Sequence, residues 1–161
     1  MAARSPLDLA ATTIATGLGS GYSPFAPGTA GSLVGLALFW PMRTWPFAWQ
    51  AAACVALFVL GAAAATRVAN HVGREDPGIV VVDEIVGMWI TLLLVPVTAW
   101  SALVGFFLFR AMDVWKPYPA RDLEALHDGL GIMADDVAAG LYANVSLHVA
   151  LVVWNHLGGR M

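Results

Sequence analysis

The sequence predicts an all-α membrane protein in which residues 1–161 form a single compact helical domain. Hydrophobic residues make up 59% of the chain and charged residues only 12%, roughly half the ~25% that is typical of soluble domains. The mean hydropathy is +0.72, and several apolar stretches are long enough for bilayer helices. A polytopic protein of this kind keeps its polar residues in the connections, so we expect an active site at the membrane interface.

The N-terminal half contains two predicted helices. Gly28–Trp40 is apolar, and we expect Pro41 to end it. Its length of roughly 20 Å is too short to cross a bilayer unaided, so it either extends into the preceding loop or re-enters the membrane. Phe47–Thr66 is the clearest spanning segment, because about twenty residues match a hydrocarbon core of ~30 Å.

The C-terminal half contains three further predicted helices. Ile85–Val95 and a segment from Ser101–Phe109 onward are separated at Pro96, because proline removes a backbone donor and disfavours helix in the residue before it. They form either two shorter helices or a tight hairpin. Val137–Trp154 is another candidate span. The run Ile79–Val82 is too short and isolated to predict a sheet.

The composition limits the kinds of binding partner that the protein can have. The net charge is −3 with only eight Lys and Arg, which does not fit a nucleic-acid-binding protein; a lipid bilayer is the expected partner. The single cysteine, Cys54, lies in an apolar run and is predicted to be a small buried hydrophobe. The N-terminus carries Asp8 as well as Arg4 and has no clean cleavage site, so we expect no signal peptide.

Polar residues gather in three connections, which are Gly17–Ser32, Arg67–Glu84 and Arg110–Asp136. The last two contain most of the Lys and Arg, whereas the connection Pro41–Pro46 contains only Arg43. Positive residues favour the cytoplasmic side of a membrane. We therefore expect the three connections to face the cytoplasm, where they can assemble one site.

The first connection is a glycine-rich loop that leads into an apolar helix. Glycines let the backbone approach an anion closely, and free N–H groups at a helix start favour phosphate. Beside Gly28, Thr29 and Ser32 place two hydroxyl groups on one side of the first turn. No Walker sequence follows. The loop is either a phosphate cradle or a tightly packed membrane loop.

Asp83 and Glu84 form the second motif and follow the apolar run Ile79–Val82. Adjacent helical residues diverge by about 100°, so both can point at one ion only if the helix begins there. The alternative is that Asp83 caps a helix and Glu84 complements its dipole.

Arg110, Asp113 and Lys116 form the third motif and recur at i, i+3 and i+6 before Pro117, which ends the helix. One interpretation is a solvated salt-bridge ladder at a helix end. The other is that Asp113 binds a cation while Arg110 or Lys116 holds a phosphate.

Asp135 and Asp136 form the fourth motif, at the start of another apolar stretch. Gly140 follows Asp136 by one helical turn and would permit close packing beside the carboxylate. One of the two acids, most simply Asp135, can instead cap the helix.

A single shared site explains all of these acids, whereas the alternative needs a separate cap or salt bridge for each motif. An unpaired carboxylate in an apolar environment costs several kcal/mol unless it is paired, protonated or bound to a cation. Mg²⁺ prefers one or two carboxylates, waters and phosphate oxygens. We predict one Mg²⁺–phosphate site, with metal-binding and catalytic residues Asp83, Glu84, Asp113 and Asp136, and phosphate-binding residues Gly28, Thr29, Ser32, Arg110 and Lys116.

These motifs, in this order, resemble those of the phosphatidylglycerophosphatase A family. The matching segments are Gly19–Ser32, Val82–Trp89, Phe109–Pro119 and Gly131–Gly140, with no departure at the motif acids or at Lys116. The resemblance implies an all-helical, Mg²⁺-dependent phosphatase at the bacterial cytoplasmic membrane. Such an enzyme hydrolyses phosphatidylglycerophosphate to phosphatidylglycerol and phosphate in phospholipid biosynthesis.

Metal-assisted hydrolysis is the expected mechanism. Cys54 has no arginine partner of the cysteine-phosphatase kind, the paired acids are not Asp-x-Asp, and the histidines do not follow the pattern of histidine-nucleophile phosphatases. We expect His148 to pack within the bundle. Mg²⁺ would neutralise the phosphomonoester and position a water, and an unassigned carboxylate would serve as general base or as a nucleophile.

Two other functions stay open. A CDP-alcohol phosphotransferase also combines membrane helices, metal and acids, but Asp128-Gly129 lacks the continuation of its signature. A non-enzymatic divalent-cation channel or transporter would place acids near mid-bilayer, whereas these lie at predicted helix starts. Trp89 and Trp115 are either interfacial anchors or core residues.

Overall fold

A computed structural model describes residues 5–123, 126 and 128–158 of the chain. Every regular element in these residues is a helix. The described residues contain no strand, so the all-α prediction is confirmed. The elements are α1 (Pro6–Ala15), the 3₁₀ turn η1 (Ser20–Tyr22), α2 (Pro27–Met42), α3 (Phe47–Val72), α4 (Val82–Leu92), α5 (Ala99–Trp115), α6 (Ala120–Leu123) and α7 (Asp128–His156).

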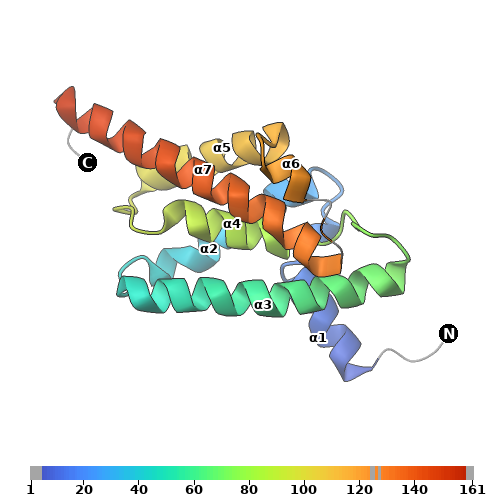
Figure 1. The fold of residues 1–161 in the computed structure, drawn as a ribbon. Helices are drawn as coiled ribbons and strands as arrows, with labels where there is room; N and C mark the ends of the chain where they lie inside the picture. The colour runs from blue at the N-terminus through green and yellow to red at the C-terminus, as the bar shows by residue number, and fades with distance from the viewer. Residues whose placement is uncertain (1–4, 124–125, 127, 159–161) are drawn as a thin grey trace.

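Five of the helices run back and forth between the two ends of the molecule (Figure 1). Helices α2, α4 and α7 begin at one end, and α3 and α5 finish there. We call this the polar end. Among the described residues, every Asp, Glu, Lys and Arg except Arg43 lies on α1, α6 or the parts of the other helices and loops at this end. The alternating direction of the helices thus brings polar segments that are distant in sequence together.

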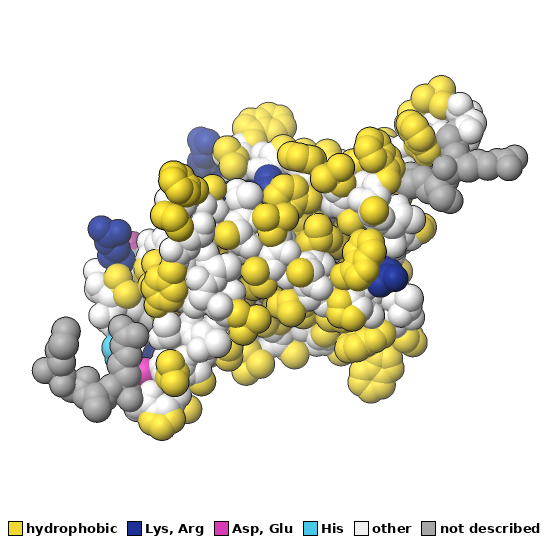
Figure 2. Space-filling view, turned by 180° about the vertical axis from the view of Figure 1, so that it is seen from behind, with side chains coloured by type: hydrophobic (Ala, Val, Ile, Leu, Met, Phe, Trp, Pro, Cys, Tyr) yellow, Lys and Arg dark blue, Asp and Glu magenta, His cyan; other side chains and the backbone are white. Residues whose placement is uncertain are grey.

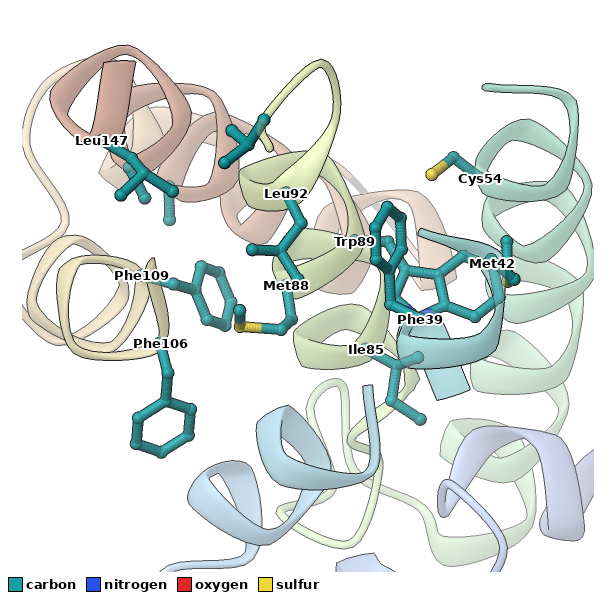
Figure 3. Close-up of a cluster of buried hydrophobic side chains, with 13 residues drawn as sticks. Phe39, Met42, Cys54, Ile85, Met88, Trp89, Leu92, Phe106, Phe109 and Leu147 are labelled. Atoms are coloured by element: carbon teal, nitrogen blue, oxygen red, sulfur yellow. The ribbon is translucent and has the colours of Figure 1, made fainter. Parts of the chain in front are cut away.

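Helix α4 is the centre of the bundle. Eight of its eleven residues are buried, as expected for a helix whose residues after the first turn are almost all apolar. Met88 of α4 packs in one cluster with Phe39 of α2 and Phe109 of α5 (Figure 3). Trp89 is also buried, and its Nε1 donates a hydrogen bond to the Gly35 carbonyl at 2.9 Å. Trp89 is therefore a core residue and not an interfacial anchor.

The end of α4 away from the polar end is held by Asn144 of α7. Its Nδ2 lies 3.1, 3.0 and 2.8 Å from the carbonyl oxygens of Ile90, Thr91 and Leu93. Asn144 thus supplies a donor to carbonyls at the end of α4, where a helix runs out of its own N–H groups. His148 follows one turn later, with Nδ1 3.0 Å from the Asn144 carbonyl oxygen. Its side chain is half-buried and lies away from the acidic motifs.

Several predicted helix boundaries are wrong; α3, for example, continues beyond Thr66 to Val72. Pro41 does not end α2 but lies in its last turn, where its missing N–H costs only one hydrogen bond near a helix end. Helix α4 begins at Val82, earlier than predicted. Helix α7 begins at Asp128, so Asp135 lies within the helix and does not cap it.

Other predicted features are confirmed. Helices α4 and α5 are separated around Pro96, and Thr98 with Ser101 forms a capping box at the start of α5. Helix α5 stops at Trp115, just before Pro117. Cys54 is buried.

Helices α3 and α7 are long and apolar enough to cross a membrane. Only 33% and 28% of the residues in their most apolar windows are buried inside the protein, so most of these side chains face outward. Figure 2 shows hydrophobic side chains over most of one face, with acidic and histidine side chains near the left margin, on the side of the N-terminus. This surface is compatible with a membrane environment.

Candidate active site

A cavity of about 1010 Å³ opens at the polar end of the bundle. Its walls come from the start of α2, the end of α3 and the following loop, the start of α4, the end of α5 and the first turns of α7. All three polar connections of the sequence thus contribute to one site.

Three acids lie together in this cavity. One carboxylate oxygen each from Asp83, Glu84 and Asp136 lies within 4.8 Å of the others. Asp83 Oδ1, Glu84 Oε2 and Asp136 Oδ2 are buried without a hydrogen-bond partner among the described residues. Burial raises the pKa of the Asp83 carboxyl well above its usual range, and the charges of Glu84 and Asp136 raise it further. Buried, orphaned oxygens at this spacing form a donor set suited to a hard cation.

The first turn of α4 explains how adjacent acids reach one site. The helix begins at Val82, and its N-cap residue Val81 makes no side-chain capping bond. Asp83 and Glu84 therefore lie in the first turn and do not cap the helix. The capping interpretation of this motif is wrong.

Two glycines bring α4 and α7 close enough to join their acids. A Cβ built on Gly140 would lie 2.5 Å from the Gly87 carbonyl oxygen, and one built on Gly87 would lie 2.8 Å from the Asp136 carbonyl oxygen. Backbone therefore packs directly on backbone at this crossing. Asp83 and Asp136 each stand one turn before the glycine of their own helix, so the crossing places both carboxylates in the cavity.

Asp113 lies beside this acidic group but has a different partner. Arg110 Nη1 forms an ion pair with the Asp113 carboxylate and lies 3.9 Å from Glu84 Oε1. Arg110 Nη1 also lies 3.5 Å from Ser32 Oγ, which donates to the Gly28 carbonyl at 2.8 Å. Asp113 thus orients Arg110. It lies outside the group of three acids whose oxygens are within 4.8 Å of one another, and its role as a metal ligand stays a prediction.

Lys116 pairs with Asp135, an acid of the fourth motif that was not among the predicted site residues. Lys116 leaves the helical conformation at φ 48°, so the predicted ladder of three charges on one helical face does not form. Its Nζ instead lies 2.8 Å from Asp135 Oδ2 on α7. Asp135 is buried and lines the cavity. In the sequence, the only indication that Asp135 belongs to the site is its position directly before Asp136.

The predicted phosphate-binding residues divide into two groups. Gly28, Arg110 and Lys116 line the cavity, whereas Thr29 and Ser32 do not. The Ser32 hydroxyl is fully buried and supports Gly28 and Arg110 as described above. The polar lining residues that the sequence did not single out include Asn70, near the end of α3, and Arg74, Glu75 and Asp76 in the loop that follows.

Comparison with known proteins agrees with these motifs. The profile of the family described as phosphatidylglycerophosphatase A matches residues 13–151. The chain belongs to the phosphatidylglycerophosphatase A family. It is similar to phosphatidylglycerophosphatase A of Escherichia coli K12, with 41% identity over 80% of this chain and 76% of the relative. The Haemophilus influenzae protein of the same name is 38% identical over 88% of each chain.

A third relative has a different name. A protein of Bacteroides thetaiotaomicron, named as a candidate phosphatidylinositol-3-phosphatase, is 43% identical over 85% of this chain and 91% of its own length. No solved structure matches the chain significantly. Membership of the phosphatidylglycerophosphatase A family makes this chain a phosphoric monoester hydrolase, and its relatives support a lipid phosphatase.

Gly28→Ala should lower phosphatase activity by roughly ten- to a hundredfold, because small displacements of catalytic groups have effects of this size. A Cβ there would clash with Glu84 Oε1 and lie 3.1 Å from Arg110 Nη1. Gly78→Ala is the control, because Gly78 lines the same cavity but its Cβ would meet no atom within 4 Å. Phosphate release measures both; equal activity of the two variants would contradict the role of Gly28.

Proposed function

We propose that this phosphatase uses Mg²⁺ to hydrolyse the phosphomonoester of phosphatidylglycerophosphate, releasing phosphatidylglycerol and phosphate in phospholipid biosynthesis. The main support for this proposal is the group of three acids, each with a buried oxygen that lacks a hydrogen-bond partner among the described residues. Arg110 and Lys116 line the same cavity. Two of the relatives are named for activity on this lipid.

Asp83, Glu84 and Asp136 would hold the Mg²⁺. They supply three carboxylate oxygens from two helices, and hard oxygen donors of this kind suit Mg²⁺. Bound there, the cation would neutralise negative charge on the phosphate and activate water for attack.

Arg110 and Lys116 would bind the phosphate oxygens. Each is held in the cavity by a carboxylate, Asp113 for Arg110 and Asp135 for Lys116. Ion pairs of this kind fix the cations before substrate arrives, and prepositioned cations stabilise charge on a transferring phosphoryl group. The Gly28 backbone leaves the space in which Glu84 and Arg110 meet.

The charge distribution supports a placement in the membrane. Helices α3 and α7 would cross the bacterial inner membrane, with the polar end at its cytoplasmic face. This orientation puts Arg67, Arg74 and Arg121 on the side that positive residues favour. The phosphate of a membrane lipid would then reach the cavity at the interface.

A substrate panel tests this proposal. The purified protein with Mg²⁺ should release phosphate from phosphatidylglycerophosphate faster than from phosphatidylinositol 3-phosphate or glycerol 3-phosphate, and EDTA should stop the reaction. Phosphatidylinositol 3-phosphate is the sharpest competitor because of the Bacteroides relative. Faster release from that lipid would overturn the substrate assignment, and release that persists in EDTA would overturn the metal requirement.

A further inference from the structure

The most exposed apolar side chains of the described chain are concentrated at the cavity mouth. Phe25, Tyr118, Val114 and Trp115 are 84%, 80%, 76% and 70% exposed. They are four of the five most exposed large hydrophobic side chains among the described residues. We call these four residues the lip.

The lip comes from two segments that meet beside the cavity. Phe25 directly precedes Ala26, which lines the cavity, and Trp115 lies between the lining residues Val114 and Lys116. Helix α2 packs against α5. The Arg110–Ser32 contact described above joins these two helices next to the acids. Both segments therefore flank the same wall of the site.

Tyr118 is held next to the middle of α7. Its carbonyl oxygen accepts a hydrogen bond from the Tyr142 hydroxyl at 2.8 Å, while its own side chain stays exposed. The backbone of this part of the lip is thus fixed even though its ring faces outward.

These side chains have the composition of a lipid-binding rim. Tryptophan and tyrosine combine an apolar ring with a polar group, and they favour the boundary between headgroups and acyl chains. Four such exposed side chains in water carry a hydrophobic cost that contact with lipid would remove.

We propose that the lip binds the diacylglycerol part of the substrate lipid while its phosphate lies in the cavity. The inference rests on the proposed lipid substrate. A phosphate that reaches the acids remains covalently attached to glycerol and acyl chains, which must leave the cavity across its rim. The lip provides apolar contacts at that rim, so the lipid enters from the bilayer without leaving it completely.

The first test compares two physical forms of phosphatidylglycerophosphate. One is the long-chain lipid in phosphatidylethanolamine vesicles, and the other is a short-chain analogue below its micelle concentration. In the variant Phe25→Ala/Trp115→Ala, the ratio of vesicle to short-chain turnover should fall roughly ten- to a hundredfold, the range expected for lost burial of two large apolar side chains. Trp49→Ala is the control, because Trp49 is 67% exposed at the opposite end of the molecule and should leave the ratio unchanged.

The second test measures contact directly. The fluorescence of Trp115, taken as the difference between wild type and Trp115→Phe, should be quenched by lipids brominated on their acyl chains. An unchanged turnover ratio in the double variant, or a Trp115 signal that brominated lipids do not quench, would overturn the proposal. If the wild type releases phosphate from neither form of the lipid, the proposed function fails, and quenching alone still decides whether the lip contacts acyl chains.

Discussion

Asp83→Asn or Asp136→Asn should reduce phosphate release by roughly a thousandfold or more. Loss of a metal that supplies several kcal/mol of transition-state stabilisation has an effect of this size. Both residues contribute an oxygen to the three-acid cluster, and they come from different helices. Asparagine keeps the size of the side chain but removes its charge, so the cavity keeps its shape.

Asp122→Asn provides the matched control. Asp122 is exposed on α6 and does not line the cavity. Its variant should release phosphate at the wild-type rate under the same conditions. Full activity in both Asp83→Asn and Asp136→Asn would show that the chemistry does not depend on this cluster.

Gly87→Ala should destabilise the protein by about 2 kcal/mol and reduce its activity as well. The added methyl group would lie 2.5 Å from the Phe109 ring and 2.8 Å from the Asp136 carbonyl oxygen. Overpacking costs about 1–3 kcal/mol, and the backbone atom cannot rotate away. Alanine gains about 1 kcal/mol of helix propensity over glycine, but a clash with both a buried ring and backbone should outweigh that gain. Separation of α4 from α7 would also move Asp83 away from Asp136.

Gly61→Ala tests whether this loss is specific to the α4–α7 crossing. Gly61 is also buried within a helix, but a Cβ there would meet side-chain atoms of Met133 and Val82 at 3.1 Å. Methionine adapts readily, so this variant should be neutral or slightly stabilised. Thermal unfolding in detergent compares the two; an equal loss of stability in both would contradict the proposed role of Gly87.

The helical fold could be predicted from composition because the apolar runs and prolines act locally. Pro96 lies in the break between α4 and α5, and Pro117 lies just after α5, so both breaks were foreseen. The beginning of α7 at Asp128 was not foreseen. The residues before Val137 include acids that line the cavity, and these polar residues hide the helix in a hydropathy pattern. A cavity formed by several helices is not visible in one-dimensional hydropathy.

The candidate site shows the same limit. Asp83, Glu84 and Asp136 could be selected because acids are conspicuous in an apolar chain. Their grouping depends on the backbone contact between Gly87 and Gly140, and the repeated four-residue spacing from acid to glycine was its only trace in the sequence. The pairing of Lys116 with Asp135 depends on a left-handed backbone conformation at Lys116. Helical periodicity predicts a different partner for this lysine.

A Mg²⁺ titration monitored by thermal unfolding tests the central claim most directly, because it requires no substrate. Mg²⁺ should raise the unfolding temperature of the wild type, by an amount equivalent to about 2.7 kcal/mol at a hundred times its dissociation constant. The variant Asp83→Asn/Asp136→Asn should show no response, and in EDTA it should be at least as stable as the wild type because two buried like charges are gone. An equal Mg²⁺ response in wild type and variant would contradict a metal site formed by Asp83, Glu84 and Asp136.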